Sequence, residues 1–484
     1  MKTDLCETCE SGYFRITVKQ GKQVIVSMIT GKEILTASRG RLLQGNPEQQ
    51  ITGFVIDSRK AKPGNFFIPF SGENTEGHHY IADAAKREGA GAFIVSGREP
   101  DPSIPPDFLL VEIEDPLVAM QRVAAYHRQR FELPVVGITG SSGKTTTKDF
   151  TAGVLSAKYK VLKTTGNLNN EIGLPLTILE LNADHQVAVL EMGMSAPGEI
   201  NTLCDIARPS IGVITNIGEA HIEMLGSVEA IARAKGELLD YLGSGGVAVL
   251  NGDDPRLLKL GERFPGKVLY YGFNQGDIKG LKLSQRGEKS FFRVRFPNRS
   301  EGWFESPLPG RESAGNALAA LTVGYILEID PAEMIKGLCS SRITGGRLQV
   351  LYNSAGTRII DDTYNANPDS VKAALNVLMD LGGEKTVAVL GDMLELGPFT
   401  EEAHRAVGRY ASQIGVGTLV TVGPMASLAA IEASRTGKTT VYSCDNHEQA
   451  IEILTGLISD KGRSVLVKGS RGMEMEKIVR ALLD

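Results

Sequence analysis

Short apolar runs alternate with amphipathic stretches through the middle of the chain. Runs with the length of buried strands stand at 133–138, 187–190, 211–215 and 247–250. Helical periodicity fills the intervals between and after them, at 144–155, 198–207, 227–242 and 254–264. Because parallel strands are joined by crossover helices, this alternation predicts a mostly parallel sheet with helices on both faces.

The same alternation occurs a second time beyond the pair of glycines at 345–346. Strand-like runs there stand at 358–360, 386–390, 418–422 and 464–467. Helical patterns separate or follow them, at 370–381, 401–414 and 450–458. Between the two patterns lie more β-rich runs at 268–272 and 291–296 and a helix at 314–327. The repeat predicts a second doubly wound α/β unit at the C-terminus.

The first part of the chain has its own, shorter pattern. Pro63 and Gly64 form a turn before a strand at 66–70, and a helix at 81–88 leads to a strand at 92–95. The stretch 101–107 is rich in proline and aspartate and is typical of a surface loop. A helix over 116–130, with proline in its first turn, opens the next domain.

These patterns predict an α/β protein of three domains. We expect an N-terminal extension over 1–27, followed by a small α/β domain over 28–112. A central domain with the parallel sheet of a P-loop ATPase would follow over 113–345, and a Rossmann-like domain over 346–484.

Composition narrows the class of protein. The chain has 484 residues, enough for two to four domains, with 42% hydrophobic and 23% charged residues, as in a soluble globular protein. Its net charge of −5 indicates neither nucleic acid nor an anionic membrane as a partner. We find no apolar run of the ~18 residues that a membrane span needs, and no apolar core of a signal peptide. We expect a cytoplasmic protein, and a monomer.

The five cysteines are few and scattered, which suits a reducing compartment. Cys6 and Cys9 have the spacing of half a zinc site, but no second close pair or histidine pair completes it. The sequence therefore gives little support to a structural metal there.

The stretch 135–147 carries the clearest chemistry. Its glycines lie between a strand and a helix, where backbone N–H groups point into one concavity at the positive end of the helix dipole. Lys144 would reach the outer phosphates of a nucleotide, and the Thr145 hydroxyl would hold Mg²⁺. The match to the general phosphate loop is imperfect, because Ile138 stands where the first glycine belongs and Gly137 comes one place earlier. The alternative is a tight turn with a surface lysine.

Polar residues follow the strands of both predicted sheets. Glu191 follows one apolar run, and the stretch 216–221, which ends in His221, follows the next. In the C-terminal half the corresponding stretches are 361–367, 391–392 and 468–471. Ligands of doubly wound folds bind beyond the carboxyl ends of the strands, and these oxygen and nitrogen donors suit Mg²⁺ and phosphates. Each residue alone could instead cap a helix or form a turn.

Two further features are ambiguous when taken alone. The glycine- and amide-rich loop 166–175 precedes an apolar helix at 174–181, and it could be an ordinary turn. Lys235 lies two turns into the helix at 227–242, on the face of Ile231 and Leu238. Such a lysine often extends to water. Beside Mg²⁺ its ammonium group would be repelled, so a role there would require a change that reverses its charge.

Taken together, these segments resemble the Mur ligases, the ATP-dependent amide ligases of peptidoglycan precursor synthesis. The resemblance extends from about Met28 to the C-terminus, and the shifted glycine of the phosphate loop is the family's own form. It is carried by 139–145, 166–173, 191–193, His221 with 226–237, Asn316 and 361–368. The runs 167–173, 362–368 and 390–397 are most similar to members that join D-alanyl-D-alanine to UDP-N-acetylmuramoyl-tripeptide.

The resemblance implies a set of binding residues. ATP and one Mg²⁺ would be bound by the phosphate loop, from which we select Gly140, Ser141, Ser142, Gly143, Lys144, Thr145 and Thr146. Glu191 would share that Mg²⁺. His221 would bind a second Mg²⁺ beside Lys235, which is carbamylated in this family. Other nucleotide contacts would come from Asn316, Arg347, Asp362, Tyr364 and Asn365. The two substrates would be bound by Ser58, Arg59, Gly72, Asn167, Asn170 and Arg471.

The implied reaction proceeds through an acyl phosphate, with domain closure about a hinge near 345–346. Other ligases of the family, and folylpolyglutamate synthase, share the central domain and remain alternatives. A P-loop GTPase is a further alternative, but the sequence lacks the Asn-Lys-x-Asp motif that would recognise guanine.

Overall fold

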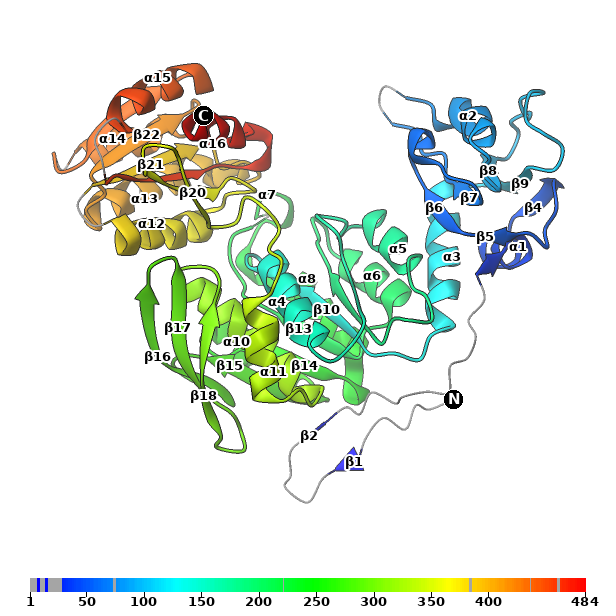
Figure 1. Ribbon diagram of the computed structural model, residues 1–484, viewed down its shortest axis with the longest axis horizontal. Coiled ribbons are helices and arrows are strands. Elements are labelled where there is room, and N and C mark those ends of the chain that lie inside the picture. Colours follow the sequence, from blue (N-terminus) through cyan, green and yellow to red (C-terminus); the bar gives the residue numbers. More distant parts are fainter. Residues whose placement is uncertain are drawn as a thin grey trace.

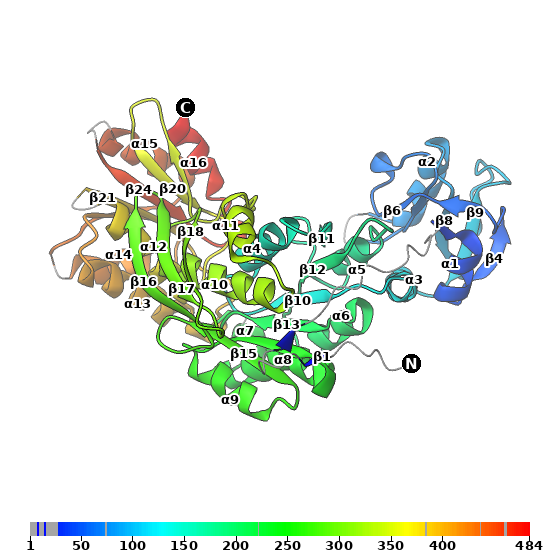
Figure 2. The ribbon, with the colours of Figure 1, turned by 60° about the horizontal axis from the view of Figure 1, so that its bottom comes forward.

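A computed structural model describes residues 7–8, 14–15, 28–72, 75–220, 222–382, 385–435, 437–458 and 462–484. Cys6, Cys9 and His221 lie outside these residues. Three larger sheets, each with its own helices, follow one another along the chain, and two further sheets have only two short strands each, β1 (Glu7–Thr8) with β2 (Phe14–Arg15) and β3 with β5. Figures 1 and 2 show the first and third at opposite ends of the molecule, with the central one between them. The α/β fold predicted from the pattern is confirmed.

The N-terminal sheet has five strands in the order β4-β9-β8-β7-β6. Its members are β4 (Arg41–Gln44), β6 (Gly53–Val55), β7 (Asn65–Phe67), β8 (Gly91–Val95) and β9 (Leu109–Ile113). Short β3 (Ile29–Thr30) and β5 (Gln50–Ile51) pair separately. Helices α1 (Gly31–Ser38) and α2 (Ile81–Lys86) belong to this unit, and Thr30 and Glu33 form a capping box at the start of α1.

The central sheet has nine strands in the order β11-β12-β10-β13-β14-β15-β16-β17-β18. The strands up to β15 are all paired in parallel, as the alternation predicted. They are β10 (Val135–Thr139), β11 (Val161–Lys163), β12 (Val187–Glu191), β13 (Ile211–Ile214), β14 (Val247–Asn251) and β15 (Lys267–Gly272).

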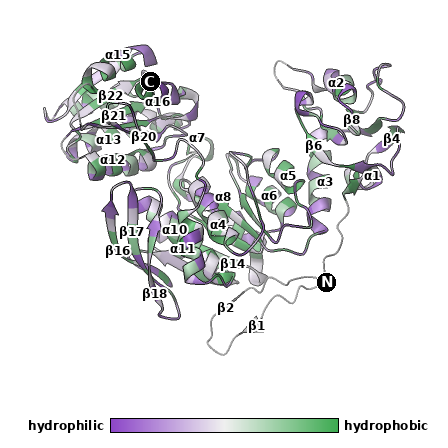
Figure 3. Cartoon of the chain, viewed as in Figure 1, coloured by the Kyte–Doolittle hydropathy of each residue, from purple (hydrophilic) through white to green (hydrophobic). Residues whose placement is uncertain are grey.

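Of the two predicted β-rich runs, 268–272 is β15 and 291–296 falls largely in β17 (Lys289–Arg295). The sheet continues from β15 to β16 (Ile278–Arg286), which pairs with it in parallel, and then in antiparallel fashion to β17 and β18 (Glu301–Ser306). Buried and more exposed residues alternate along these strands, so they show hydrophilic colours in Figure 3 where the inner strands are apolar. The extension lies beside the C-terminal domain in Figures 1 and 2. A Cβ atom on Gly310, just after β18, would lie 2.5 Å from the side chain of Val377 in the C-terminal domain.

Helices cover both faces of the central sheet. One face packs against α4 (Lys144–Ser156), α10 (Arg311–Ile326) and α11 (Pro331–Cys339). The other packs against α3 (Pro116–Gln129), α5 (Gly173–Ile178), α6 (Glu199–Ala207) and α8 (Val228–Leu242). Ser227 caps α8 by accepting from the Ala230 N–H, and Asp254 caps α9 (Pro255–Arg263) in the same way. The sequence predicted both helix starts.

The C-terminal sheet has six strands in the order β19-β20-β24-β21-β22-β23, and only β19 pairs in antiparallel fashion. They are β19 (Gln349–Tyr352), β20 (Arg358–Asp362), β21 (Thr386–Gly391), β22 (Thr418–Val422), β23 (Thr440–Cys444) and β24 (Ser464–Lys468). The helices are α12 (Pro368–Gly382), α13 (Thr400–Gln413), α14 (Ser427–Ser434), α15 (His447–Ile458) and α16 (Glu476–Leu483).

A glycine at the contact of α13 and α14 gives a prediction for stability. A Cβ atom on Gly408 would lie 2.1 Å from the backbone oxygen of Ala429, so Gly408→Ala must push the two helices apart. We expect a loss of about 1–3 kcal/mol in the free energy of unfolding, measured by urea denaturation. Gly456→Ala on α15 is the control, because no described atom lies within 4 Å of its Cβ position. Equal stability of the two variants would contradict the close packing.

Candidate active site

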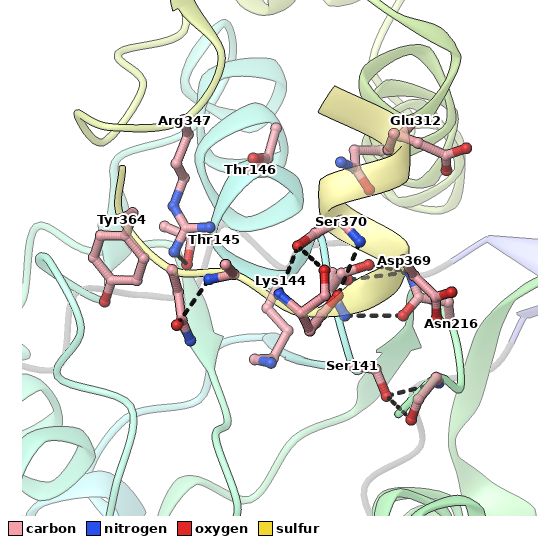
Figure 4. A pocket seen from close by; sticks show the side chains of 18 of the residues that line it. Ser141, Lys144, Thr145, Thr146, Asn216, Glu312, Arg347, Tyr364, Asp369 and Ser370 are labelled. Atoms are coloured by element: carbon pink, nitrogen blue, oxygen red, sulfur yellow. Dashed lines mark hydrogen bonds between the residues drawn. The ribbon is translucent and has the colours of Figure 1, made fainter. Parts of the chain in front are cut away.

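A cavity of about 740 Å³ lies between the central and C-terminal domains. It opens at the carboxyl ends of β10, β12 and β13, as expected for a doubly wound sheet. Figure 4 shows side chains from both domains facing it. The predicted residues that line it are Ser141, Ser142, Gly143, Lys144, Thr145, Thr146, Asn167, Asn170, Glu191, Asn316, Arg347, Asp362, Tyr364 and Asn365.

The predicted UDP-sugar residues do not line this cavity. Ser58, Arg59 and Gly72 belong to the N-terminal domain, which lies at the far end of the molecule from the C-terminal domain. There the Ser58 hydroxyl donates to Asp83 at 3.0 Å, and the Arg59 guanidinium pairs with Asp57 at 2.9 Å. Arg471 pairs with Glu476 at 2.9 Å and does not line the cavity either.

The phosphate loop is held in shape by the loop that follows β13. The Ser142 N–H donates to the Asn216 side-chain oxygen at 2.9 Å, and the Ser141 hydroxyl donates to the Gly218 carbonyl at 3.0 Å. The Lys144 ammonium donates to the Gly140 carbonyl at 2.6 Å, so the lysine lies across its own loop. The free N–H groups of the loop are thereby presented to the cavity in one arrangement.

The shifted glycine pattern has a steric explanation. A Cβ atom on Gly140 would lie 1.9 Å from the Thr215 hydroxyl, and one on Gly143 would lie 2.5 Å from the Asn316 side chain. Gly143 also has a φ of +78°, which favours glycine. Gly137 lies inside β10, where a Cβ atom would lie 3.1 Å from Met192. The shape of the loop therefore requires glycine at 140 and 143. Gly137 instead allows Met192 to pack closely against β10.

Glu191 ends β12 with its carboxylate at the cavity. One carboxylate oxygen accepts from the Asn169 amide at 2.7 Å, and the Glu191 N–H donates to the Thr164 hydroxyl at 3.0 Å. The other carboxylate oxygen is buried and has no hydrogen-bond partner among the described residues. Asn169 was not among the predicted site residues, although the amide-rich loop that contains it was noted.

Two lysines lie close to one another here: Lys144 lines the cavity, whereas Lys235 does not. Lys235 on α8 is only 1% exposed, and no described carboxylate pairs with it. Burial holds the pKa of Lys235 well below its usual value, and the charge of Lys144 adds to this effect. Burial also lowers the pKa of Lys144, against the opposing attraction of Glu191. An anion in the cavity would stabilise the charged forms of both lysines.

The C-terminal domain places a cation directly against the phosphate loop. The Arg347 guanidinium donates to the Thr145 hydroxyl at 2.7 Å and stacks 4.0 Å from the centre of the Tyr364 ring. The Lys468 ammonium donates to Asp362 at 2.5 Å and to the Asn365 carbonyl at 2.9 Å. Burial raises the pKa of the Asp362 carboxyl, although the Lys468 charge opposes that rise.

Several residues that line the cavity were missed by the sequence prediction. Asn216 and Lys468 lay in stretches noted after strands, but only other members of those stretches were selected. In the stretch 468–471 it is Lys468 that lines the cavity, whereas Arg471 does not. Glu312 and Asp369 also line it, and each lies in the first turn of a helix, where an acidic residue is common for structural reasons.

This chain belongs to the Mur ligase family. The family's sequence models match it over residues 50–128 ("Mur ligase family, catalytic domain"), 138–324 ("Mur ligase middle domain") and 346–471 ("Mur ligase, glutamate ligase domain").

Among the described residues no helix is long and apolar enough to cross a membrane.

Two named relatives are similar over nearly their whole length. The UDP-N-acetylmuramoyl-tripeptide–D-alanyl-D-alanine ligase of Bacillus subtilis strain 168 is 37% identical, over 94% of this chain and 98% of the relative. The ligase of the same name from Escherichia coli K12 is 36% identical, over 89% of this chain and 93% of the relative.

Solved structures give the same picture. A crystal structure of MurF from Acinetobacter baumannii superposes with a TM-score of 0.86 at 30% identity, and covers 95% of this chain and 100% of that one. MurF from Thermotoga maritima in complex with ADP has a TM-score of 0.77 at 28% identity, and covers 89% of this chain and 96% of that one.

Proposed function

We propose that this chain is the ATP-dependent ligase that joins D-alanyl-D-alanine to UDP-N-acetylmuramoyl-tripeptide in peptidoglycan synthesis. The observation that carries the proposal is the single cavity in which the phosphate loop of one domain meets Arg347, Asp362 and Tyr364 of the next. Relatives with this activity align with almost the entire chain. ATP and a UDP-linked precursor are cytoplasmic metabolites, so we place the enzyme in the bacterial cytoplasm and expect it to act as a monomer.

The chemistry requires activation of a carboxylate. A carboxylate is a poor electrophile, so the terminal carboxylate of the tripeptide attacks the γ-phosphorus of ATP, giving an acyl phosphate and ADP. The free amine of D-alanyl-D-alanine then attacks the acyl carbon, phosphate leaves, and the amide forms. Lys144 lies across the phosphate loop and Arg347 contacts Thr145, so both would neutralise the charge that gathers on the transferred phosphoryl group.

The donors present at the cavity fit Mg²⁺. The buried oxygen of Glu191 that has no partner, and the hydroxyl of Thr145, are hard ligands of the kind Mg²⁺ prefers. No group of three His, Cys, Asp or Glu side chains forms among the described residues, so phosphate oxygens and water would complete the coordination. We propose two ions, the second of them held by His221 and a modified Lys235. Bound Mg²⁺ would supply charge stabilisation at the phosphates.

A carbamate on Lys235 is consistent with its surroundings. Only a neutral amine attacks CO₂, and the low pKa of this buried lysine favours the neutral form. Attack on CO₂ releases a proton and leaves a carboxylate-like group of negative charge. That group would bind a cation where the ammonium would repel it, and it would offset the charge of Lys144.

Further contacts complete the proposal. Asn316 would contact the adenine, and the other nucleotide contacts would be those of Asp362, Tyr364 and Asn365. Asn167, Asn170 and Arg471 would lie near the peptide substrates, and Ser58, Arg59 and Gly72 would bind the UDP-sugar. Because these groups belong to three domains, closure about 345–346 would assemble the site and exclude water from the acyl phosphate.

A substrate panel tests the assignment. The purified chain is incubated with ATP, Mg²⁺ and UDP-N-acetylmuramoyl-tripeptide, and phosphate release is measured with and without D-alanyl-D-alanine. We expect release that depends on the dipeptide. Release that instead depends on a single amino acid, or on a folate with glutamate, would identify another member of the family and contradict the proposal.

A further inference from the structure

The segment between the central and C-terminal domains is anchored on its central side by two buried or partly buried charges. It leaves α11 after Cys339 and enters β19 at Gln349. Lys163 donates to the Arg342 carbonyl at 3.4 Å. Asp149 on α4 accepts from both the N–H and the hydroxyl of Thr344, each at 2.8 Å. Residues 342–344 are therefore attached to the central domain.

The next residues are attached to the other domain. The Gly346 carbonyl accepts from the Tyr364 N–H at 3.0 Å, and the Leu348 N–H donates to Asp362 at 3.1 Å. Only Gly345 lies between the two sets of anchors. It is exposed, and no described atom lies within 4 Å of its Cβ position. A glycine without neighbours turns with little resistance, so a rotation between the domains would meet least resistance at this residue.

The Asp149 carboxylate is held in one position by the groups around it. It is 1% exposed, accepts from Lys163 at 2.7 Å, and lies 3.4 Å from the buried Lys148 ammonium. Burial opposes its ionisation, but Lys148, Lys163 and the Thr344 N–H together lower the pKa of the carboxyl below its usual value. A buried carboxylate with several donors around it is held rigidly, and Thr344 is held with it.

Helix geometry connects this anchor to the reaction. Asp149 and Thr145 are four residues apart and lie on one face of α4. That face contacts the interdomain segment twice, through Thr344 at Asp149 and through Arg347 at Thr145. Asp149 itself does not line the cavity, so it does not touch the nucleotide.

We infer that Asp149 is a positioning residue for the ligase reaction. It fixes Thr344 on α4 and so holds Arg347, three residues further on, in the place beside Thr145 that it has in this structure, where it would meet the transferring phosphate. The inference rests on the proposed function, because it takes closure onto ATP as the step that Arg347 completes. Loss of the contact between Asp149 and Thr344 should lower kcat and leave nucleotide affinity unchanged.

The test uses the full-length enzyme with Thr344→Val, which removes the hydroxyl, and Thr344→Ser, which retains it. We expect Thr344→Val to lower kcat about tenfold, with the Kd for ADP within about twofold, and Thr344→Ser to restore kcat. Asp149→Asn should lower kcat further, and the double variant Asp149→Asn/Thr344→Val should be no slower than Asp149→Asn alone. Thr151→Val, at another buried position of α4, should retain kcat within about twofold.

Equal kcat values for Thr344→Val and Thr344→Ser, or additive effects in the double variant, would overturn the inference. So would a Kd for ADP that rises in step with the fall in kcat. Small-angle scattering with and without ADP and Mg²⁺ gives a second readout, in which the wild type should become more compact and Thr344→Val less so. This compaction needs no acceptor substrate. A wild type that compacts with ADP but releases no phosphate with D-alanyl-D-alanine would refute the proposed function. It would not contradict the role of Asp149 in anchoring Thr344.

Discussion

Lys144→Ala should lower D-alanyl-D-alanine-dependent phosphate release by a factor of about 10²–10³. Lys144 lies across the phosphate loop with its ammonium 2.6 Å from the Gly140 carbonyl, and the charge of Glu191 acts on it. The charge that develops on the transferred phosphoryl group would lose its fixed partner, and water entering the gap would replace it poorly. The measurement is kcat at saturating substrates, by coupled phosphate detection.

Lys158→Ala is the matched control for Lys144→Ala. Lys158 lies two residues beyond α4, and its ammonium donates to the Glu328 carbonyl on the surface. This variant should retain kcat within about twofold, because a surface contact of this kind contributes little. If Lys144→Ala kept more than a tenth of the wild-type kcat, the role given to the phosphate-loop lysine would be wrong.

Lys235→Ala should reduce kcat by a factor similar to that of Lys144→Ala, about 10²–10³, if its carbamate holds a metal ion. The side chain is buried and has no described carboxylate partner, so its removal costs little in pairing energy and the fold should persist. Short carboxylic acids such as formate or acetate should partly restore kcat, because they can occupy the space of the lost carbamate with the same charge.

Arg233→Ala is the control on the same helix, since Arg233 is exposed and lies two residues from the buried Lys235, on the opposite face of α8. It should retain activity and show no response to added acids. The wild type should also lose activity when CO₂ is removed from the buffer and regain it with bicarbonate. Full activity of Lys235→Ala would contradict the proposal that Lys235 and His221 hold a second metal ion.

The pattern of apolar runs was sufficient to predict most of the parallel strands and many of their helices, although the parallel strands β9, β11 and β23 were missed. Fully buried strands such as β10 and β13 consist almost entirely of apolar residues and glycine, and a sheet covered on both faces requires such segments. The antiparallel strands β16 and β18 were missed. Each carries charged or polar residues at its more exposed positions, together with the exposed Trp303 in β18, so neither forms a continuous apolar run.

Sequence reasoning about the site worked where a residue type has a specific chemical use. Lys144, Thr145 and Glu191, and Asp362, Tyr364 and Asn365 of the second α/β unit, belong to segments at or after the ends of strands, and the structure brings them to one cavity, whereas Arg471 lies outside it. Asn169 and Asp369 were not selected, because amides and acids just before a helix or in its first turn are most often turn formers and caps. Only their tertiary neighbours, Glu191 for Asn169 and Gly218 for Asp369, distinguish them.

The order of strands and helices, the glycine-rich loop and the ligase family were contained in the sequence, because each depends on residues that are neighbours along the chain. The tertiary structure alone decided what lies opposite the loop. Arg347 reaches Thr145 across about 200 residues of sequence, and Thr344 reaches Asp149 across a similar separation. Such contacts arise from the packing of one domain against another. No local pattern encodes them, because either residue would have the same sequence neighbours if the domains were turned apart.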